Sequence, residues 1–154
     1  MWSKGRLKQL NIARGVTLIE LMVAVALVSV LFFGLASIYV LMDDAWNRGA
    51  SLVNLQRDGS YAMYEFSTTI RQGAMAVVAP TQLTVQDGSG TTIGRFYLEQ
   101  SDNTLRDDSG TKVIPSTVDS LAFSQAGATI LVDLLLVDDR ENAVFFNTRV
   151  SMRN

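Results

Sequence analysis

A single carboxylate, Glu20, lies at the start of a long apolar segment. It is the only charged side chain between Gly15 and Met42. An ionised carboxylate in a lipid-facing segment costs free energy, so its presence implies a partner. Gly15, five residues earlier, has no side chain that would obstruct the approach of an active site to its carbonyl group. Gly15 and Glu20 are therefore the first candidates for functional residues.

The composition excludes several kinds of chemistry. The 154 residues include no cysteine and no histidine, which excludes a disulfide framework, a cysteine nucleophile, an imidazole metal site and a Ser-His-Asp triad. Basic and acidic residues number 13 and 15, for a net charge of −2, and this near-neutral balance argues against a general nucleic-acid-binding role. The sequence contains no catalytic constellation, and we expect neither enzymatic activity nor a cofactor.

The basic residues of the N-terminal region all precede the apolar segment, at Lys4, Arg6, Lys8 and Arg14, and no acid precedes Glu20. Residues 21–42 form an uncharged run. As a helix rising about 1.5 Å per residue, this run reaches roughly 33 Å, enough to cross a hydrocarbon core of about 30 Å. The basic flank predicts a cytoplasmic N-terminus and an exported remainder.

The sequence from Arg14 to Met22, RGVTLIELM, resembles the processing and methylation motif of type IV prepilins and type II secretion pseudopilins. In that family a membrane-embedded peptidase removes a short basic leader after the glycine, on the cytoplasmic side, and methylates the new N-terminal amine. The resemblance implies cleavage between Gly15 and Val16, N-methylation of Val16 and an assembly role for Glu20. Val16 departs from the family pattern, in which phenylalanine is commoner at this position.

Cleavage after Gly15 would create the kind of partner that Glu20 needs. The new α-amine of Val16 would lie about one helical turn from Glu20, and two subunits offset along their axes could pair the amine of one with Glu20 of the other. At about 4 Å and an effective dielectric of about 20, such a pair attracts by about 4 kcal/mol before desolvation is subtracted. Because desolvation offsets much of this attraction, we assign the pair to the register and recruitment of subunits more than to net stability. Without residues 1–15, the remaining 139 residues carry nine basic and 15 acidic groups, a net charge of −6 before the new terminus is counted.

Other interpretations of this segment remain open. Glu20 could be an interfacial side chain that reaches water and has no partner. The sequence Gly34-Leu35-Ala36 before Ser37 fits a secretory signal cleavage site, but the apolar run continues to Met42 and Glu20 would lie inside the core of that signal. A plain single-pass anchor explains the apolar segment but not the placement of Gly15 and Glu20.

After the apolar segment the pattern becomes that of an amphipathic helix. Apolar or small residues recur every three or four positions, at Leu52, Leu55, Gly59, Ala62, Phe66 and Ile70. No proline lies between residues 16 and 79, so we expect one continuous helix over residues 17–72. Gly73 is expected to end it in the left-handed conformation.

Beyond Pro80 the apolar period changes to two, which predicts strands at residues 82–86, 92–99, 112–114, 120–124, 129–137 and 143–151. Residues that favour turns separate them, and the short intervals favour an antiparallel meander. Both faces of residues 129–137 are mostly apolar, so this segment is expected to be a central strand with one face against the helix.

These elements predict an α+β fold of the pilin-like kind, in which the first half of a long helix spans the membrane and the second half packs on an antiparallel sheet. The expected domains are a cleaved leader at residues 1–15, a transmembrane and assembly segment at 16–42, an amphipathic half-helix at 43–73 and a β domain at 74–154.

Two further stretches, residues 55–73 and 148–154, resemble minor pilins and J-type minor pseudopilins. The resemblance implies a minor subunit that helps to initiate, prime or cap a type IV pilus or a type II secretion pseudopilus. The implied partners are a prepilin peptidase and methyltransferase, other minor pilins or pseudopilins, the major subunit and the inner membrane. The β domain would be periplasmic and later lie at a filament tip; which machine it serves is open. The alternative is an inner-membrane-anchored periplasmic binding domain that does not enter a filament.

Loop residues could also be interpreted as calcium ligands, because oxygen donors suit that ion: Asp102, Asn103, Asp107 and Asp108. Their spacing fits no calcium-loop pattern, and turn chemistry accounts for them, as it does for Asp138, Asp139 and Glu141. We therefore predict no metal site.

Overall fold

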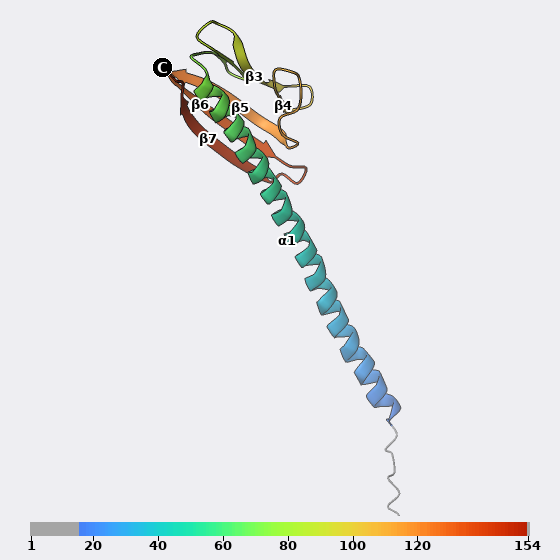
Figure 1. The fold of residues 1–154 in the computed structure, drawn as a ribbon. Helices are drawn as coiled ribbons and strands as arrows, with labels where there is room; N and C mark the ends of the chain where they lie inside the picture. Colours follow the sequence, from blue (N-terminus) through green and yellow to red (C-terminus); the bar gives the residue numbers. More distant parts are fainter. Residues whose placement is uncertain (1–15, 154) are drawn as a thin grey trace, which may run out of the picture. The chain divides into compact units, whose positions relative to one another are not determined.

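The structure, a computed structural model, describes residues 16–153, so the expected leader and Gly15 lie outside the described residues. One helix, α1 (Leu18–Gln72), is followed by seven strands (Figure 1). The chain divides into two units at residues 43 and 44, and each is described by itself. The expected pilin-like α+β arrangement, with a long N-terminal apolar helix before antiparallel strands, is confirmed.

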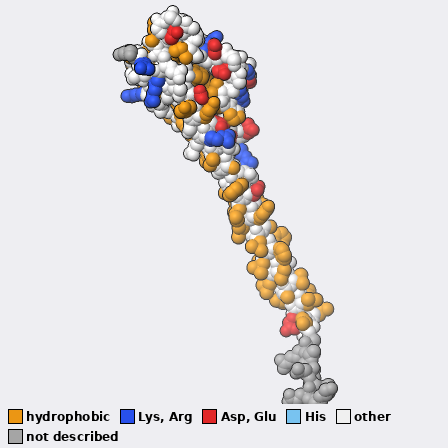
Figure 2. All heavy atoms as spheres, viewed as in Figure 1, with side chains coloured by type: hydrophobic (Ala, Val, Ile, Leu, Met, Phe, Trp, Pro, Cys, Tyr) orange, Lys and Arg blue, Asp and Glu red, His pale blue; other side chains and the backbone are white. Residues whose placement is uncertain are grey.

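The first unit contains the apolar part of α1. Its side chains are all exposed, and hydrophobic side chains cover its visible surface (Figure 2). The hydroxyl groups of Ser29 and Ser37 donate hydrogen bonds to the carbonyl oxygens of Val25 and Phe33, four residues earlier. Each hydroxyl group thus has a hydrogen-bond partner within the helix. It needs no water molecule as a partner, and none would be present around a helix in hydrocarbon.

The second unit contains two antiparallel sheets. The first has the order β1-β2-β3-β4 and the second the order β5-β6-β7. The strands are β1 (Met75–Ala79), β2 (Gln82–Gln86), β3 (Thr92–Glu99), β4 (Thr104–Arg106), β5 (Thr117–Ala126), β6 (Thr129–Val137) and β7 (Ala143–Ser151). Backbone hydrogen bonds from Phe123 to Pro80 and from Val118 to Asn103 connect the two sheets.

The expected strands agree with β2, β3, β6 and β7 at both ends, but the prediction was wrong elsewhere. Strands β1 and β4 were not predicted, and β5 is longer than the expected 120–124. The strand expected at 112–114 is only an isolated bridge between Arg106 and Lys112. Strand β4 was missed because it has only three residues. Strand β1 was missed because its five residues are all apolar and do not alternate with polar ones.

The second half of α1 buries one face against both sheets (Figure 1). The ring of Phe66 contacts Phe96 of β3 and Phe123 of β5 edge to face, with centroid separations of 4.9 and 5.5 Å. One helical side chain thus joins the two sheets, in the geometry that aromatic pairs prefer. The predicted apolar face is largely confirmed, because Leu55, Gly59, Ala62, Phe66 and Ile70 are buried; Leu52 is 37% exposed.

Strand β6 is the central strand of its sheet, as its composition predicts. Ile130, Val132, Leu134 and Leu136 are all fully buried. The alternate residues, including Leu131 and Leu135, are half-buried on the outer face. A strand that is apolar on both faces and paired on both edges is the expected place for such a sequence.

Polar contacts also connect α1 to the β domain. The buried carboxylate of Asp58 accepts a hydrogen bond of 2.6 Å from the hydroxyl of Ser116 and pairs with Arg57 at 3.1 Å. The Ser51 hydroxyl donates to Asp138 in the loop between β6 and β7. Hydrogen bonds from Ser51 and Asn142 lower the pKa of Asp138 to about 2, so this carboxylate is ionised at neutral pH.

Three loops are closed in the same way by an aspartate that accepts hydrogen bonds from the backbone N–H groups two and four residues later: Asp87, Asp107 and Asp138. The residue three positions after the aspartate has a left-handed backbone. It is a glycine in the first two loops, Gly90 and Gly110, but Glu141 in the third, with φ of 62°. Only the third loop therefore carries the steric cost of a side chain in this conformation.

Packing requires a glycine at two positions, Gly59 within α1 and Gly73 directly after it. Gly73 follows the helix as expected, but it is not among the residues with positive φ, so its predicted left-handed conformation is wrong. Glycine is needed there because a Cβ atom would lie 2.2 Å from the Val85 side chain. A Cβ atom on Gly59 would lie 2.0 Å from the Phe146 ring, so Gly59 permits the close approach of α1 to β7.

Replacing Gly59 by alanine tests this approach. Alanine favours a helix by about 1 kcal/mol over glycine, but the clash with Phe146 costs about 1–3 kcal/mol through overpacking. We expect Gly59→Ala to lower the midpoint of thermal unfolding of the full chain in detergent. The matched control is Gly49→Ala, where a Cβ atom meets nothing within 4 Å, and it is expected to raise the midpoint. Equal shifts in the two variants would contradict the packing argument.

Candidate functional site

The start of α1 is organised by Thr17 and Glu20. The backbone N–H and the hydroxyl of Thr17 donate hydrogen bonds to Oε2 of Glu20, at 2.9 and 3.1 Å. The backbone N–H of Glu20 lies 3.3 Å from the hydroxyl oxygen of Thr17. These reciprocal contacts form a capping box, in which two helix-terminal N–H groups that have no partner within the helix are satisfied by side chains.

The capping box fixes the Glu20 carboxylate at the first turn of the helix. Both hydrogen bonds that it accepts use Oε2, so Oε1 can accept a bond from a second group. A negative charge at this position also interacts favourably with the helix dipole. Glu20 is therefore not an unsatisfied charge within one chain, and it keeps one oxygen for a partner.

Thr17 is the residue of this site to which the sequence analysis gave no role. The signal that could have found it is a threonine followed three positions later by a glutamate, just before an apolar run. Val16, beside Thr17, is 73% exposed and precedes the first helical residue, Leu18. Of the two residues of the expected scissile bond, Val16 is accessible, and Gly15 lies outside the described part of the chain.

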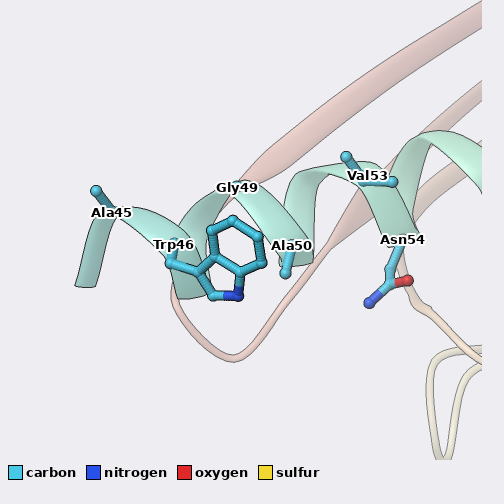
Figure 3. A pocket seen from close by; sticks show the side chains of 6 residues that line it. All are labelled: Ala45, Trp46, Gly49, Ala50, Val53 and Asn54. Carbon is cyan, nitrogen blue, oxygen red and sulfur yellow. The ribbon is translucent and has the colours of Figure 1, made fainter. Parts of the chain in front are cut away.

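The second half of α1 has an exposed apolar surface on its outer face. Large side chains are exposed there at helical spacing, on the face opposite the buried one: Trp46, Val53, Tyr61 and Tyr64. Ala45, Trp46, Gly49, Ala50, Val53 and Asn54 line a groove on this surface. Trp46, Ala50 and Asn54 project from the same side of the helix (Figure 3).

Two of the loop carboxylates considered as calcium ligands, Asp102 and Asp107, accept hydrogen bonds from nearby groups. Asp102 accepts hydrogen bonds from the Thr104 hydroxyl and Arg106, at 2.6 and 2.7 Å, and these bonds lower its pKa. Asp107 closes its own loop, mainly through Ser109, which also lowers its pKa. Such bonds are the turn chemistry that the sequence suggested.

The comparison with protein families agrees with this geometry. The sequence model of the prokaryotic N-terminal methylation motif matches residues 10–36, which include Gly15, Val16, Thr17 and Glu20. That motif is the hallmark of type IV prepilin-like and pseudopilin proteins. The chain carries this N-terminal methylation motif.

This motif implies processing by a prepilin peptidase and assembly with other pilins, and it indicates a structural subunit rather than an enzyme. The long apolar stretch of α1 is sufficient in length and composition to cross a membrane, which fits a membrane-anchored pilin. The match ends at residue 36, so the β domain lies outside it. Comparisons with curated proteins and with solved structures gave no match to this chain.

The capping box gives a prediction for Thr17. In Thr17→Val the hydroxyl is lost, and the first turn of α1 is expected to lose about 1 kcal/mol of stability. Hydrogen exchange of the amides of residues 17–21 in detergent micelles should therefore become faster by about fivefold. Thr17→Ser keeps the hydroxyl and is the matched control, with exchange close to that of the unsubstituted chain. Unchanged exchange in Thr17→Val would show that the box does not hold the helix start.

Proposed function

We propose that this chain is a minor pilin or minor pseudopilin that is cleaved between Gly15 and Val16, methylated at Val16 and assembled through Glu20. The observation that carries the proposal is the combination of the methylation motif with a capped acid at the start of an exposed apolar helix. A membrane anchor alone does not require an acid at this place, whereas a subunit that recognises a neighbour's N-terminal amine does.

The capping box supports a specific form of this recognition. Thr17 holds one oxygen of the Glu20 carboxylate, so the second oxygen can accept a hydrogen bond from the α-amine of an axially offset subunit. Because the carboxylate is already ordered, little side-chain entropy is lost when the amine arrives. Desolvation offsets much of the attraction, so the pair acts mainly in register and recruitment.

The outer face of α1 supports assembly along the length of the helix. Apolar side chains are exposed between Leu18 and Met42, and the second half of α1 has its own exposed stripe, which includes Trp46, Val53 and Tyr61. In the membrane, lipid covers the first part of this surface, and in a filament the helices of other subunits cover both parts. Exposed apolar side chains beyond the span are therefore suited to a subunit that leaves the lipid.

The minor role rests on the resemblance of residues 55–73 and 148–154 to minor pilins and J-type pseudopilins. A major pilin often closes its sheet with a C-terminal disulfide, and this chain contains no cysteine. In the proposed function the β domain lies in the periplasm, contacts other minor subunits and helps to initiate, prime or cap the filament.

The mass of the processed protein tests the proposed maturation. When the chain is expressed with a prepilin peptidase and extracted from membranes, we expect loss of residues 1–15 and one added methyl group on Val16. Gly15→Val should block cleavage, because the new side chain obstructs the scissile carbonyl group, while Gly34→Val, in the small-residue site of the alternative signal, should have no effect. A chain that begins at Ser37, or an uncut Met1, would refute the proposal.

Two substitutions at Glu20 separate the charge from the cap. Glu20→Ala removes both, whereas Glu20→Gln retains an oxygen for the capping box but no charge. We expect both variants to be cleaved normally and to enter filaments at least about tenfold less, the effect of about 1.4 kcal/mol. Normal incorporation of Glu20→Gln would show that the cap, and not the charge pair, is what assembly requires. Normal incorporation of both variants would remove the pairing argument and leave the maturation unaffected.

The alternative, an anchored binding domain outside any filament, makes a different prediction for the same chains. Its processing could resemble that of a pilin, but Glu20→Ala and Glu20→Gln would not alter its distribution between membrane and filament fractions. Quantifying the chain in sheared filaments against the membrane fraction distinguishes the two functions.

A further inference from the structure

Strand β7 forms one edge of its sheet. It pairs with β6 along its whole length, from Ala143 opposite Val137 to Ser151 opposite Thr129. No strand among residues 16–153 pairs with its other side. An edge strand of this kind presents a row of backbone N–H and C=O groups that another chain can use.

The positions of these outward groups follow from the ends of the ladder. Backbone hydrogen bonds join Asp138 to Asn142 before β7 and Met152 to Ala128 after it. Because hydrogen-bonded pairs alternate in an antiparallel ladder, the even-numbered residues of β7 bond to β6. The odd-numbered residues therefore direct their N–H and C=O groups away from the sheet, at 143, 145, 147, 149 and 151.

This edge lacks the features by which proteins usually protect edge strands. Strand β7 has nine residues, no proline and no register shift against β6, and Arg149 is its only charged residue. The other edges differ. Strand β4 has three residues, and β1 has five and is followed by Pro80. Strand β5, on the opposite edge of the same sheet as β7, is hydrogen-bonded to Pro80 and Asn103.

The side chains of β7 also leave surface for another strand. Val144 and Phe146, on the core face, are only partly buried, and Phe145 on the outer face is 62% exposed. The residue opposite Arg149 on β6 is Leu131, so the guanidinium has no acid across from it. An added strand would cover Val144 and Phe146 and could place an acid beside Arg149.

The direction of β7 argues against an antiparallel pair of two copies. Asn142 bonds to Asp138, which bonds to Ser51, whereas Phe146 lies against Gly59. The strand therefore runs in the same direction as α1. Antiparallel pairing of β7 with the β7 of a second copy would point the membrane ends of the two helices, at Asp44, in opposite directions, which does not suit two copies anchored in one membrane.

We propose that β7 binds an extended segment of a different protein, which adds to the sheet as an antiparallel fourth strand. The segment alternates apolar residues, which cover Val144 and Phe146, with residues on the outer face that include an acid beside Arg149. Main-chain hydrogen bonds to Phe145, Asn147 and Arg149 supply affinity, and the alternating side chains supply specificity. This binding goes beyond the proposed function, because it does not require cleavage at Gly15 or incorporation through Glu20.

The test uses the full chain in its native envelope, with a photo-crosslinking benzoylphenylalanine in place of Ala143. Two further substitutions at Phe145 form a matched pair. Phe145→Pro and Phe145→Thr both remove the ring, but only the proline removes the outward N–H group, which does not bond to β6. The crosslinking residue in place of Ala122, on the outer face of β5, is the positional control.

The expected product joins Ala143 to one other protein, through a peptide with alternating apolar residues and an acid. Its yield should fall about tenfold in Phe145→Pro and much less in Phe145→Thr, as lost backbone bonding predicts. Equal yields in the two variants, a product between two copies of this chain, or a product only from the Ala122 position would each overturn the proposal.

Charge reversal keeps the proposal testable if Phe145→Pro does not fold. Arg149→Glu should lower the yield about tenfold, and replacing the acid of the crosslinked peptide by lysine should restore it. Failure of the second change to restore the product would exclude the proposed charge pair and the antiparallel register that places it. Cleavage after Gly15, measured on the same samples, reports separately on the proposed maturation.

Discussion

The hydrogen bonds between Thr17 and Glu20 close the first turn of α1 at the place where the apolar helix begins. Every following residue up to Met42 is uncharged, so this turn is the one point of the segment that can be recognised electrostatically. By satisfying one carboxylate oxygen within the chain, the capping box lowers the free-energy cost of placing an acid next to lipid. It also leaves the second oxygen for an intermolecular contact. In the proposed function, one side chain thereby serves both membrane insertion and filament entry, which make opposite demands on a charge.

The same helix meets two different environments along its length. Its first part is apolar on every face, whereas its second part buries Leu55, Ala62 and Phe66 and leaves Tyr61 and Tyr64 exposed. Phe66 contacts one aromatic ring from each sheet, so the two sheets are assembled on the helix as well as on each other. A change in the position of this helical face would therefore be transmitted to both sheets. The β domain packs on one face of this half of α1, and the exposed stripe with Tyr61 and Tyr64 lies on the opposite face.

Much of this organisation could be predicted from the sequence, because it depends on periodic patterns. The continuous helix follows from the absence of proline and the three-to-four spacing, and the burial of β6 follows from its alternating apolar residues. What could not be predicted depends on contacts between distant segments. The division of the strands into two sheets, the requirement for Gly59 beside Phe146 and the reason for Gly73 beside Val85 all arise from tertiary approach. Thr17 differs, because the local sequence alone indicates its capping role, through a threonine three positions before a glutamate at the start of an apolar run.

The loop that Asp138 closes combines an unfavourable backbone conformation with stabilising hydrogen bonds. Glu141 occupies a backbone conformation that the other two loops assign to glycine, at a cost of about 1 kcal/mol. Asp138 offsets this cost with bonds to Arg140, Asn142 and the helical Ser51. The ionised carboxylate of Asp138 thus holds the loop between β6 and β7 closed and attaches it to Ser51 of α1, although Glu141 has an unfavourable backbone conformation. Loss of the bond between Ser51 and Asp138 would detach this loop from α1 without removing the bond between Met152 and Ala128 at the other end of the hairpin.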